Sequence, residues 1–148
     1  MSGRAERLVP VVEMALKAER EAARQLGVAQ GQLQQQQRKL AEVERYRLDY
    51  QQQWIEQGQQ GVSGHWLINY QRFLSQLEAA VEQMNRAIAW HQEVVDKARV
   101  TWQEKYARLE GLRKLVERYR EEARMAADKR EQKQLDEFAQ RLRPRNED

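Results

Sequence analysis

Cysteine is absent from this chain of 148 residues, and its two prolines, Pro10 and Pro144, lie close to the ends. The lack of cysteine excludes disulfides and thiolate chemistry and fits a reducing compartment. No apolar run approaches the roughly 20 residues that a membrane-spanning helix needs, and the N-terminus lacks the apolar core of a signal peptide. We therefore expect a soluble, cytoplasmic protein. Because proline is the residue that most often breaks helices, its absence between Pro10 and Pro144 allows long helices.

A large excess of one charge is also lacking. The 26 lysine and arginine residues are nearly balanced by 23 aspartate and glutamate residues, and the two signs alternate along the chain. Such interleaving is typical of solvated helix faces and speaks against a nucleic acid partner. A basic coiled coil that binds nucleic acid or serves as a scaffold is kept as an alternative, since it would show a steep salt dependence of binding.

Heptad periodicity is what the chain has in abundance. From Leu67 to Ala126 a heptad repeat runs without interruption, and sixteen of the eighteen positions that would face a partner helix are apolar. We call these positions the seam. They are Leu67, Tyr70, Leu74, Leu77, Val81, Met84, Ile88, His91, Val95, Ala98, Trp102, Lys105, Leu109, Leu112, Val116, Tyr119, Ala123 and Ala126. A repeat of 3.5 residues held over this length predicts one long helix in a left-handed coiled coil.

A second, weaker heptad pattern runs from about Leu8 to Gln57. Ten of its thirteen seam positions are apolar, which is enough for a partner helix. They are Val12, Ala15, Glu19, Ala22, Leu26, Ala29, Leu33, Gln36, Leu40, Val43, Arg47, Tyr50 and Trp54. Gly27 and Gly31 interrupt this pattern at about 1 kcal/mol each relative to alanine, so we expect local softness there and no break.

The segment 58–64 is the only turn signal in the interior. Gly58 can adopt the left-handed backbone conformation that ends many helices, so we expect it to end the first helix. Ser63 is placed to cap the second. Two long helices joined by so short a loop must be antiparallel, with residue i of the first opposite about residue 122 − i of the second. The fold class is therefore all-α, a long antiparallel two-helix coiled coil (a helical hairpin) whose second helix is longer than the first.

We expect a single coiled-coil domain over residues 1–148. It begins with a flexible start (residues 1–7), a first helix (8–57) and a turn (58–64). A second helix (65–141) and a flexible tail (142–148) follow. Since the first helix runs out opposite about Lys114, the seam of the second helix beyond Tyr119 needs a partner that this chain does not supply.

Residues for catalysis are missing from the pattern. The sequence has no glycine-rich phosphate loop, no histidine pair at the spacing of metal ligands and no serine or cysteine nucleophile beside a base. His65 at the turn is best interpreted as a capping or solvent residue, and His91 in the seam as a core histidine or a register-setting polar residue. We therefore expect no enzyme activity, no metal and no cofactor.

Four residues near the turn are level with one another in the estimated register. They are Tyr46 and Tyr50 on the first helix and Phe73 and Leu77 on the second. Tyr46 and Phe73 fall just outside the seam, so neither can bury fully between two helices. An aromatic patch should be partly exposed here, and exposed aromatic residues are common hot spots of protein interfaces. A purely packed stretch of seam is the alternative, and the two are equally favoured by the residues alone.

Two motifs are similar to those of a known family. The string Trp66-Leu-Ile-Asn-Tyr70-Gln-Arg-Phe73, with Leu77-Glu and Glu82-Gln after it, resembles the FliJ family of bacterial flagellar export proteins. Gln132-Lys133-Gln-Leu-Asp136-Glu137-Phe138-Ala-Gln-Arg141 resembles the closing segment of that family. The length and the hairpin layout also match, so the resemblance covers nearly the whole chain.

The resemblance implies a cytoplasmic component of the flagellar type III export apparatus, peripheral at the inner face of the membrane. In that family the hairpin is similar to the γ-subunit stalk of rotary ATPases, links the export ATPase hexamer to the cytoplasmic domain of the export gate, and escorts export chaperones. The positions that match the family's gate-binding residues are Tyr46, Tyr50, Phe73, Leu77 and Val43. Lys39 stands at a sixth such position, where it departs from the family's glutamine.

The end of the second helix is the expected contact with the ATPase ring. From Ala127 to Arg143 the apolar stripe gives way to charged residues, and such a helix end could enter a ring with a polar lining. The residues we expect there are Lys129, Arg130, Lys133, Leu135, Phe138 and Arg141. A stalk of the related virulence secretion system would share this mechanism, although the string from Trp66 to Phe73 favours the flagellar branch.

Overall fold

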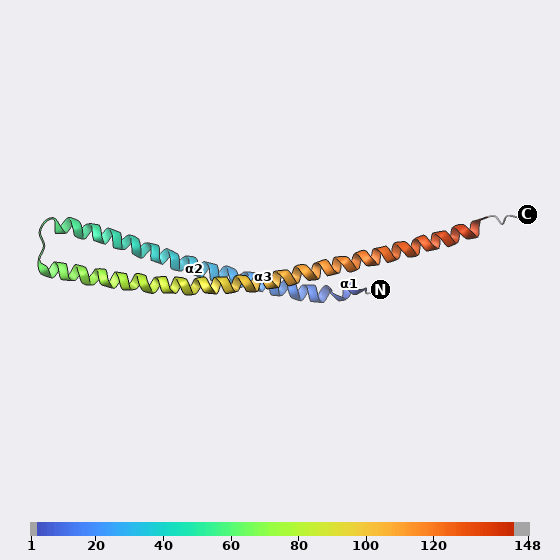
Figure 1. The fold of residues 1–148 in the computed structure, drawn as a ribbon, viewed down its shortest axis with the longest axis horizontal. Helices are drawn as coiled ribbons and strands as arrows, with labels where there is room; N and C mark the ends of the chain where they lie inside the picture. The colour runs from blue at the N-terminus through green and yellow to red at the C-terminus, as the bar shows by residue number, and fades with distance from the viewer. Residues whose placement is uncertain (1–2, 144–148) are drawn as a thin grey trace, which may run out of the picture. The chain divides into compact units, whose positions relative to one another are not determined.

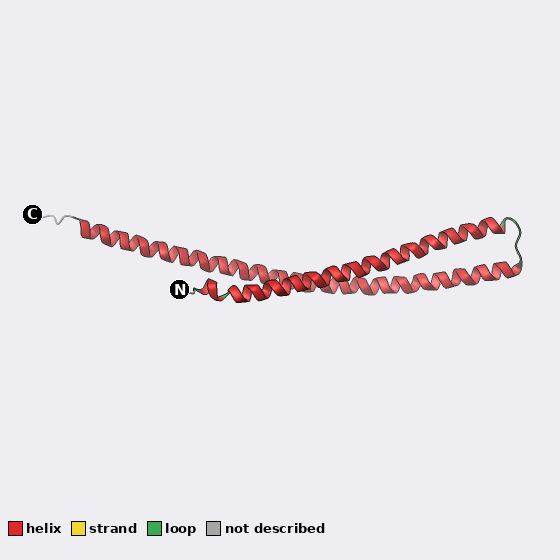
Figure 2. Cartoon of the chain, turned by 180° about the vertical axis from the view of Figure 1, so that it is seen from behind, coloured by secondary structure: helices red, strands yellow, loops and turns green. Residues whose placement is uncertain are grey.

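Two long helices and one short one make up the fold. The computed structural model describes residues 3–143, which form α1 (Arg4–Arg7), α2 (Val9–Gly58) and α3 (Gly64–Leu142) and contain no strand (Figure 1; Figure 2 shows the same elements from behind). The all-α hairpin with a longer second helix is thus confirmed. α2 and α3 begin and end within one residue of the bounds that the heptads predict.

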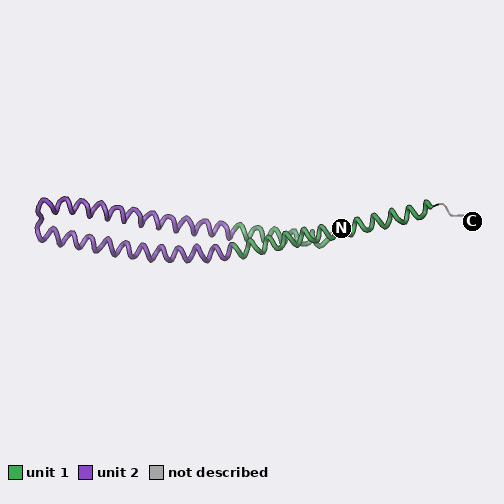
Figure 3. The backbone as a smooth tube through the Cα atoms, turned by 45° about the horizontal axis from the view of Figure 1, so that its top comes forward, with its two compact units in different colours: residues 1–20, 103–148 green, residues 21–102 purple. Residues whose placement is uncertain are grey.

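The chain divides into two compact units where the sequence predicts a single domain. One unit consists of residues 21–102, and the other consists of residues 1–20 together with residues 103–148 (Figure 3). In the first unit α2 and α3 run side by side in opposite directions on either side of the turn (Figure 1). In the second, the start of the chain accompanies α3 along part of its length, and the final turns of α3 have no neighbouring helix.

The turn reverses the chain at a different glycine from the one expected. Gly61 has φ of +90° and is the only residue with a positive φ in the described range 3–143, whereas Gly58 is still part of α2. The reason is that α2 ends in a tightened turn, in which the N–H of Gln60 and that of Gly61 donate to Gln57 and Gly58. The predicted cap of α3 is confirmed, because the Ser63 hydroxyl accepts a hydrogen bond of 3.2 Å from the Trp66 N–H.

The seam of α2 agrees with the heptad pattern at every position. All thirteen predicted residues are buried or half-buried, and Ala15, Ala22, Ala29 and Leu33 are the most enclosed. Ala29 and Leu33 form a core cluster with Val95 of α3, against which Leu26 and Ile88 also pack. The small alanines allow the two helices to approach closely, while leucine and valine supply most of the apolar area.

The seam of α3 agrees at fourteen of its eighteen positions and differs at four. Lys105 is exposed, as are Ala123 and Ala126 near the far end, where a partner was expected to be missing. Leu67 is 46% exposed, and Trp66 is half-buried in its place. The seam therefore enters α3 one residue earlier than the heptad frame predicts, because the larger indole ring packs against Trp54 and Tyr70.

Part of the predicted flexible start is helical. Arg4–Arg7 form α1, a single turn that ends at Leu8. Pro10 has no N–H to donate to the preceding turn, which explains why α2 begins separately at Val9. The guanidinium of Arg4 lies 4.8 Å from the centre of the Tyr119 ring and 3.8 Å from Glu122, so the start of the chain partly covers Tyr119. The predicted tail lies outside the described residues after Arg143, and Leu142 still belongs to α3.

Candidate protein-docking surfaces

Six aromatic rings gather beside the turn in the unit of residues 21–102. We call them the tip cluster, which consists of Tyr46, Tyr50 and Trp54 from α2 and Trp66, Tyr70 and Phe73 from α3. The ring centres of Tyr50 and Phe73 are 4.1 Å apart, and those of Trp54 and Trp66 are 4.2 Å apart. These pairs are within two residues of the predicted register, so α2 and α3 meet in the expected alignment.

Only one ring of the tip cluster is largely exposed. Tyr46 is 53% exposed, whereas the other five are half-buried. Its ring stacks on Tyr50 at 6.1 Å and meets the edge of Phe73 at 6.2 Å. Contacts of this kind hold an aromatic side chain in one orientation while a face remains open to a partner. The expectation that Tyr46 lies partly outside the seam is confirmed.

The remaining residues of the predicted gate set lie further from the loop, Val43 and Leu77 by one helical turn and Lys39 by two. Val43 and Leu77 are half-buried seam residues, and Lys39 is exposed. The rings of Tyr46, Tyr50 and Phe73 are in direct contact, while Val43 and Leu77 lie in the seam one turn away. Of this set, only Tyr46 and Lys39 are exposed.

Sequence reasoning missed half of the tip cluster. Trp54 and Tyr70 were placed in the seam without being joined to the aromatic patch, and Trp66 was not assigned a position at all. The spacing of Trp66, Tyr70, Phe73 and Leu77 follows the three-four rhythm of a buried stripe. The heptad frame that starts at Leu67 instead predicts burial of the adjacent face of α3.

The far end of α3 carries the second candidate surface. Every residue from Glu121 to Arg143 is exposed, including the predicted ring-binding residues Lys129, Arg130, Lys133, Leu135, Phe138 and Arg141. Leu135, Phe138 and Leu142 lie three and four residues apart and so share one face of the helix. That face is not the continuation of the seam, whose next positions are Arg130, Lys133 and Glu137.

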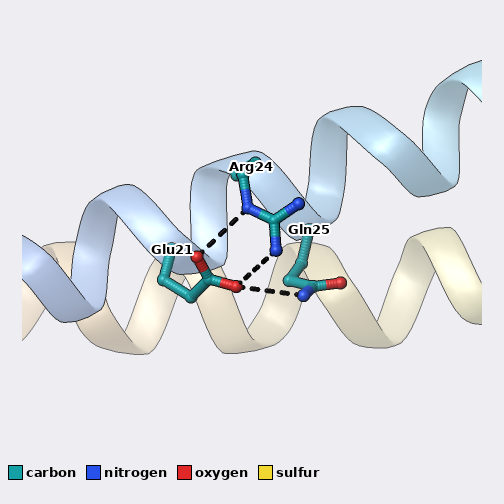
Figure 4. A network of polar contacts seen from close by, with 3 residues as sticks. All are labelled: Glu21, Arg24 and Gln25. Atoms are coloured by element: carbon teal, nitrogen blue, oxygen red, sulfur yellow. Dashed lines mark hydrogen bonds and ion pairs between the residues drawn. The ribbon is translucent and has the colours of Figure 1, made fainter.

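A network of polar contacts lies on the exposed surface of α2. The guanidinium of Arg24 donates to both oxygens of Glu21, at 3.1 and 2.7 Å, and the amide of Gln25 donates to the same carboxylate at 3.1 Å (Figure 4). The hydrogen bond from Arg24, followed by that from Gln25, lowers the pKa of Glu21 from 4.5 to about 2. Glu21 is solvent-exposed and binds its own helix neighbours, so this network stabilises α2 locally and forms no reactive site.

No group of residues suited to hold a metal ion occurs within the described range. His65 is exposed at the turn. His91 is half-buried in the seam, and its Nδ1 atom is buried with no hydrogen-bond partner in the described part of the chain. No helix there is long and apolar enough to cross a membrane.

Comparison with known proteins agrees with this description. Residues 4–148 match the family model described as "Flagellar FliJ protein". The chain is 33% identical over 134 residues to the flagellar FliJ protein of Escherichia coli K12, covering 90% of this chain and 91% of that one. It is also 33% identical over 129 residues to the flagellar FliJ protein of Salmonella typhi, covering 87% and 88%. The chain therefore belongs to the FliJ family of flagellar proteins.

Proposed function

We propose that this protein is a stalk of the flagellar type III export apparatus, which links the export ATPase ring to the export gate and escorts export chaperones. It would act in the cytoplasm and reach the membrane only through its contact with the gate. Membership of the FliJ family supports a role in the flagellum. The accessible ring of Tyr46, held against Tyr50 and Phe73, is the observation that carries the proposal of a protein-binding tip.

The tip cluster is the proposed contact with the cytoplasmic domain of the gate. Aromatic residues that are held rigidly and remain half-open lose little conformational entropy on binding and offer a large apolar area. Tyr46 would contact the partner directly, with Phe73 forming the floor beside it. Val43, Tyr50 and Leu77 would hold these two rings in place.

The end of α3 is the proposed contact with the ATPase hexamer. Its face of Leu135, Phe138 and Leu142 has no partner within residues 3–143, and charged side chains of both signs surround it. Lys129, Arg130, Lys133 and Arg141 would contact acidic groups of the ring. Leu135 and Phe138 would supply the apolar part of the contact.

A binding experiment with a matched control tests the tip. Tyr46→Ala should weaken affinity for the cytoplasmic domain of the gate by roughly 30-fold, the usual effect of losing a hot spot worth about 2 kcal/mol. Leu48→Ala is the control, since Leu48 is an equally exposed residue of α2 that belongs to no ring contact of the cluster. Equal affinities of the two variants, measured by surface plasmon resonance, would show that the gate binds elsewhere.

A further inference from the structure

α3 carries a wider apolar stripe than a two-helix seam uses. The residue just before the first seam position of each heptad is apolar and half-buried four times in succession, at Phe73, Ala80, Ala87 and Val94. The residues that flank the seam on the other side are all polar and exposed, namely Gln71, Glu78, Asn85, Gln92 and Arg99. A two-stranded coiled coil needs two apolar positions per heptad, and a third widens the stripe toward that of a helix in a bundle.

An exposed tryptophan extends this stripe on its outer side. Trp90 lies one helical turn from Val94, and it is 61% exposed. Its indole meets the imidazole of His91 edge-on, with 4.9 Å between ring centres, which favours a fixed orientation of the side chain. A large, oriented and solvent-facing tryptophan is the residue type most enriched in interface hot spots.

α2 contributes an apolar residue to the same face. Tyr46 and Phe73 each precede a seam residue, and their ring contact shows that these flanking positions of the two helices face each other. Gln32 is the flanking position two heptads before Tyr46, and Val28 lies one turn from it. Val28 is exposed and, by the register, nearly level with Val94. We call Val28, Gln32, Ala87, Trp90 and Val94 the Trp90 face.

The strip between Trp90 and Val28 carries no charged residue, and ammonium groups stand at its two ends. Its exposed polar residues there are amides: Gln25, Gln32, Gln35 and Gln83. Lys39 and Lys97 stand at the ends and form no ion pair within residues 3–143, whereas Arg24 and Arg86 are each held by a glutamate at 2.7 Å. Because Lys39 is level with about residue 83, the backbone positions of the two lysines are about 21 Å apart along the hairpin at 1.5 Å per residue.

We propose that the Trp90 face docks one amphipathic α-helix of a partner protein, which completes a three-helix bundle with α2 and α3. The docked helix has an aliphatic stripe that covers Trp90 and Val94, and acidic side chains about four turns apart that meet Lys39 and Lys97. A second copy of this chain fits less well, because it would bring the same two ammonium groups to the contact. This surface adjoins the proposed gate contact, since Lys39 also belongs to the predicted gate set, and it is separate from the proposed ATPase contact.

Designed peptides test the proposal on the full chain. The probe is a hydrocarbon-stapled helix of 18 residues with leucine along one face and glutamate at two positions 14 residues apart, and its counterpart has lysine at those two positions. Fluorescence anisotropy should show at least tenfold tighter binding of the acidic peptide, and this preference should shrink as salt is raised. Trp90→Ala should weaken binding of the acidic peptide by about tenfold or more, and Trp90→Phe should restore most of it.

Val100→Ala is the matched control, since Val100 is an exposed apolar residue of α3 that does not belong to the Trp90 face. It should leave peptide binding unchanged, and circular dichroism should show that all variants remain helical. Equal binding by the Trp90→Ala and Val100→Ala variants would overturn the proposal, as would equal affinity for the two peptides. A dimer in sedimentation equilibrium that Trp90→Ala dissociates would also overturn it, because the face would then join two copies of this chain.

Discussion

The two ends of α3 carry similar apolar residues, but these residues are half-buried at one end and exposed at the other. At one end Trp66, Tyr70 and Phe73 are half-buried against rings of α2. At the other, Leu135, Phe138 and Leu142 repeat the same three-four spacing, yet all three are more than half exposed. The spacing predicts a helix with an apolar face in both cases. Burial depends on whether a second helix is present, and only the first end has one.

The unpaired end stays helical for local reasons. Residues 127–142 are rich in alanine, lysine, arginine, glutamine and glutamate, which all have high helix propensity, and the amide of Gln132 donates to Asp136 one turn later at 3.2 Å. Such contacts contribute only tenths of a kcal/mol. The segment should therefore open far more readily than the paired part of α3, and its apolar face is available to another protein.

Removing the unpaired end is the strongest test of this difference. A chain that stops after Arg124 should melt within a few degrees of the full-length chain, since the deleted side chains bury almost nothing. It should no longer associate with the flagellar ATPase hexamer or stimulate it, as measured by pulldown and ATP hydrolysis. Raised salt should reproduce part of this loss in the intact chain. Full association of the truncated chain would place the ATPase contact elsewhere.

Two leucines of α3 allow the comparison at single-residue scale. Leu109 is 2% exposed and Leu135 is 57% exposed. Leu109→Ala should lower the free energy of unfolding by about 2 to 4 kcal/mol, because it removes buried methyl groups and leaves a cavity. Leu135→Ala should change it by less than about 0.5 kcal/mol. Chemical denaturation followed by circular dichroism measures both, and equal losses would mean that the end of α3 is packed.

Most of the fold was predictable because one repeat controls it. The seam of α2 was predicted at every position, since a heptad fixes which residues face the partner. Differences from the prediction occur at the turn, where the heptad repeat no longer determines the conformation of the chain. At the turn, hydrogen bonding moved the left-handed residue from Gly58 to Gly61, and the bulk of Trp66 displaced Leu67 from the seam. Side-chain size and local hydrogen bonds of this kind are not visible in an apolar pattern.

The candidate surfaces were predictable to a smaller extent. Tyr46 and Phe73 were found because they lie just outside the seam at matching heights. The accessible ring of Tyr46 and the inclusion of Trp54, Trp66 and Tyr70 depend on rotamers and ring contacts. Trp90 is a similar case, because the sequence places it outside the seam without showing that its neighbours on that face lack charge.

Glycine substitutions sharpen the comparison between helix and turn. An added Cβ at Gly27 or Gly31 would meet nothing within 4 Å. Each change to alanine should therefore raise the free energy of unfolding by roughly 0.5 to 1 kcal/mol. Gly61→Ala should lower it by about 1 kcal/mol, because φ at Gly61 is +90°. Thermal melts would contradict this account if all three changes had the same sign.

The smallest expected effect comes from a local contact on the surface of α2, which contributes to stability without any packing between helices. Glu21 is exposed, and its carboxylate is bound by Arg24 and Gln25 of the same helix (Figure 4). Because its pKa in the folded chain is about 2, the fold favours the charged form. The resulting stabilisation is present above pH of about 4.5 and is lost as pH falls toward 2.

Carbon-detected NMR titration of the Glu21 carboxyl should show this low pKa, and Arg24→Gln should raise it more than Gln25→Ala does. High salt should also raise it, since solvent ions screen an exposed pair. A Glu21 pKa that is unchanged by Arg24→Gln would mean that the contact contributes nothing in solution.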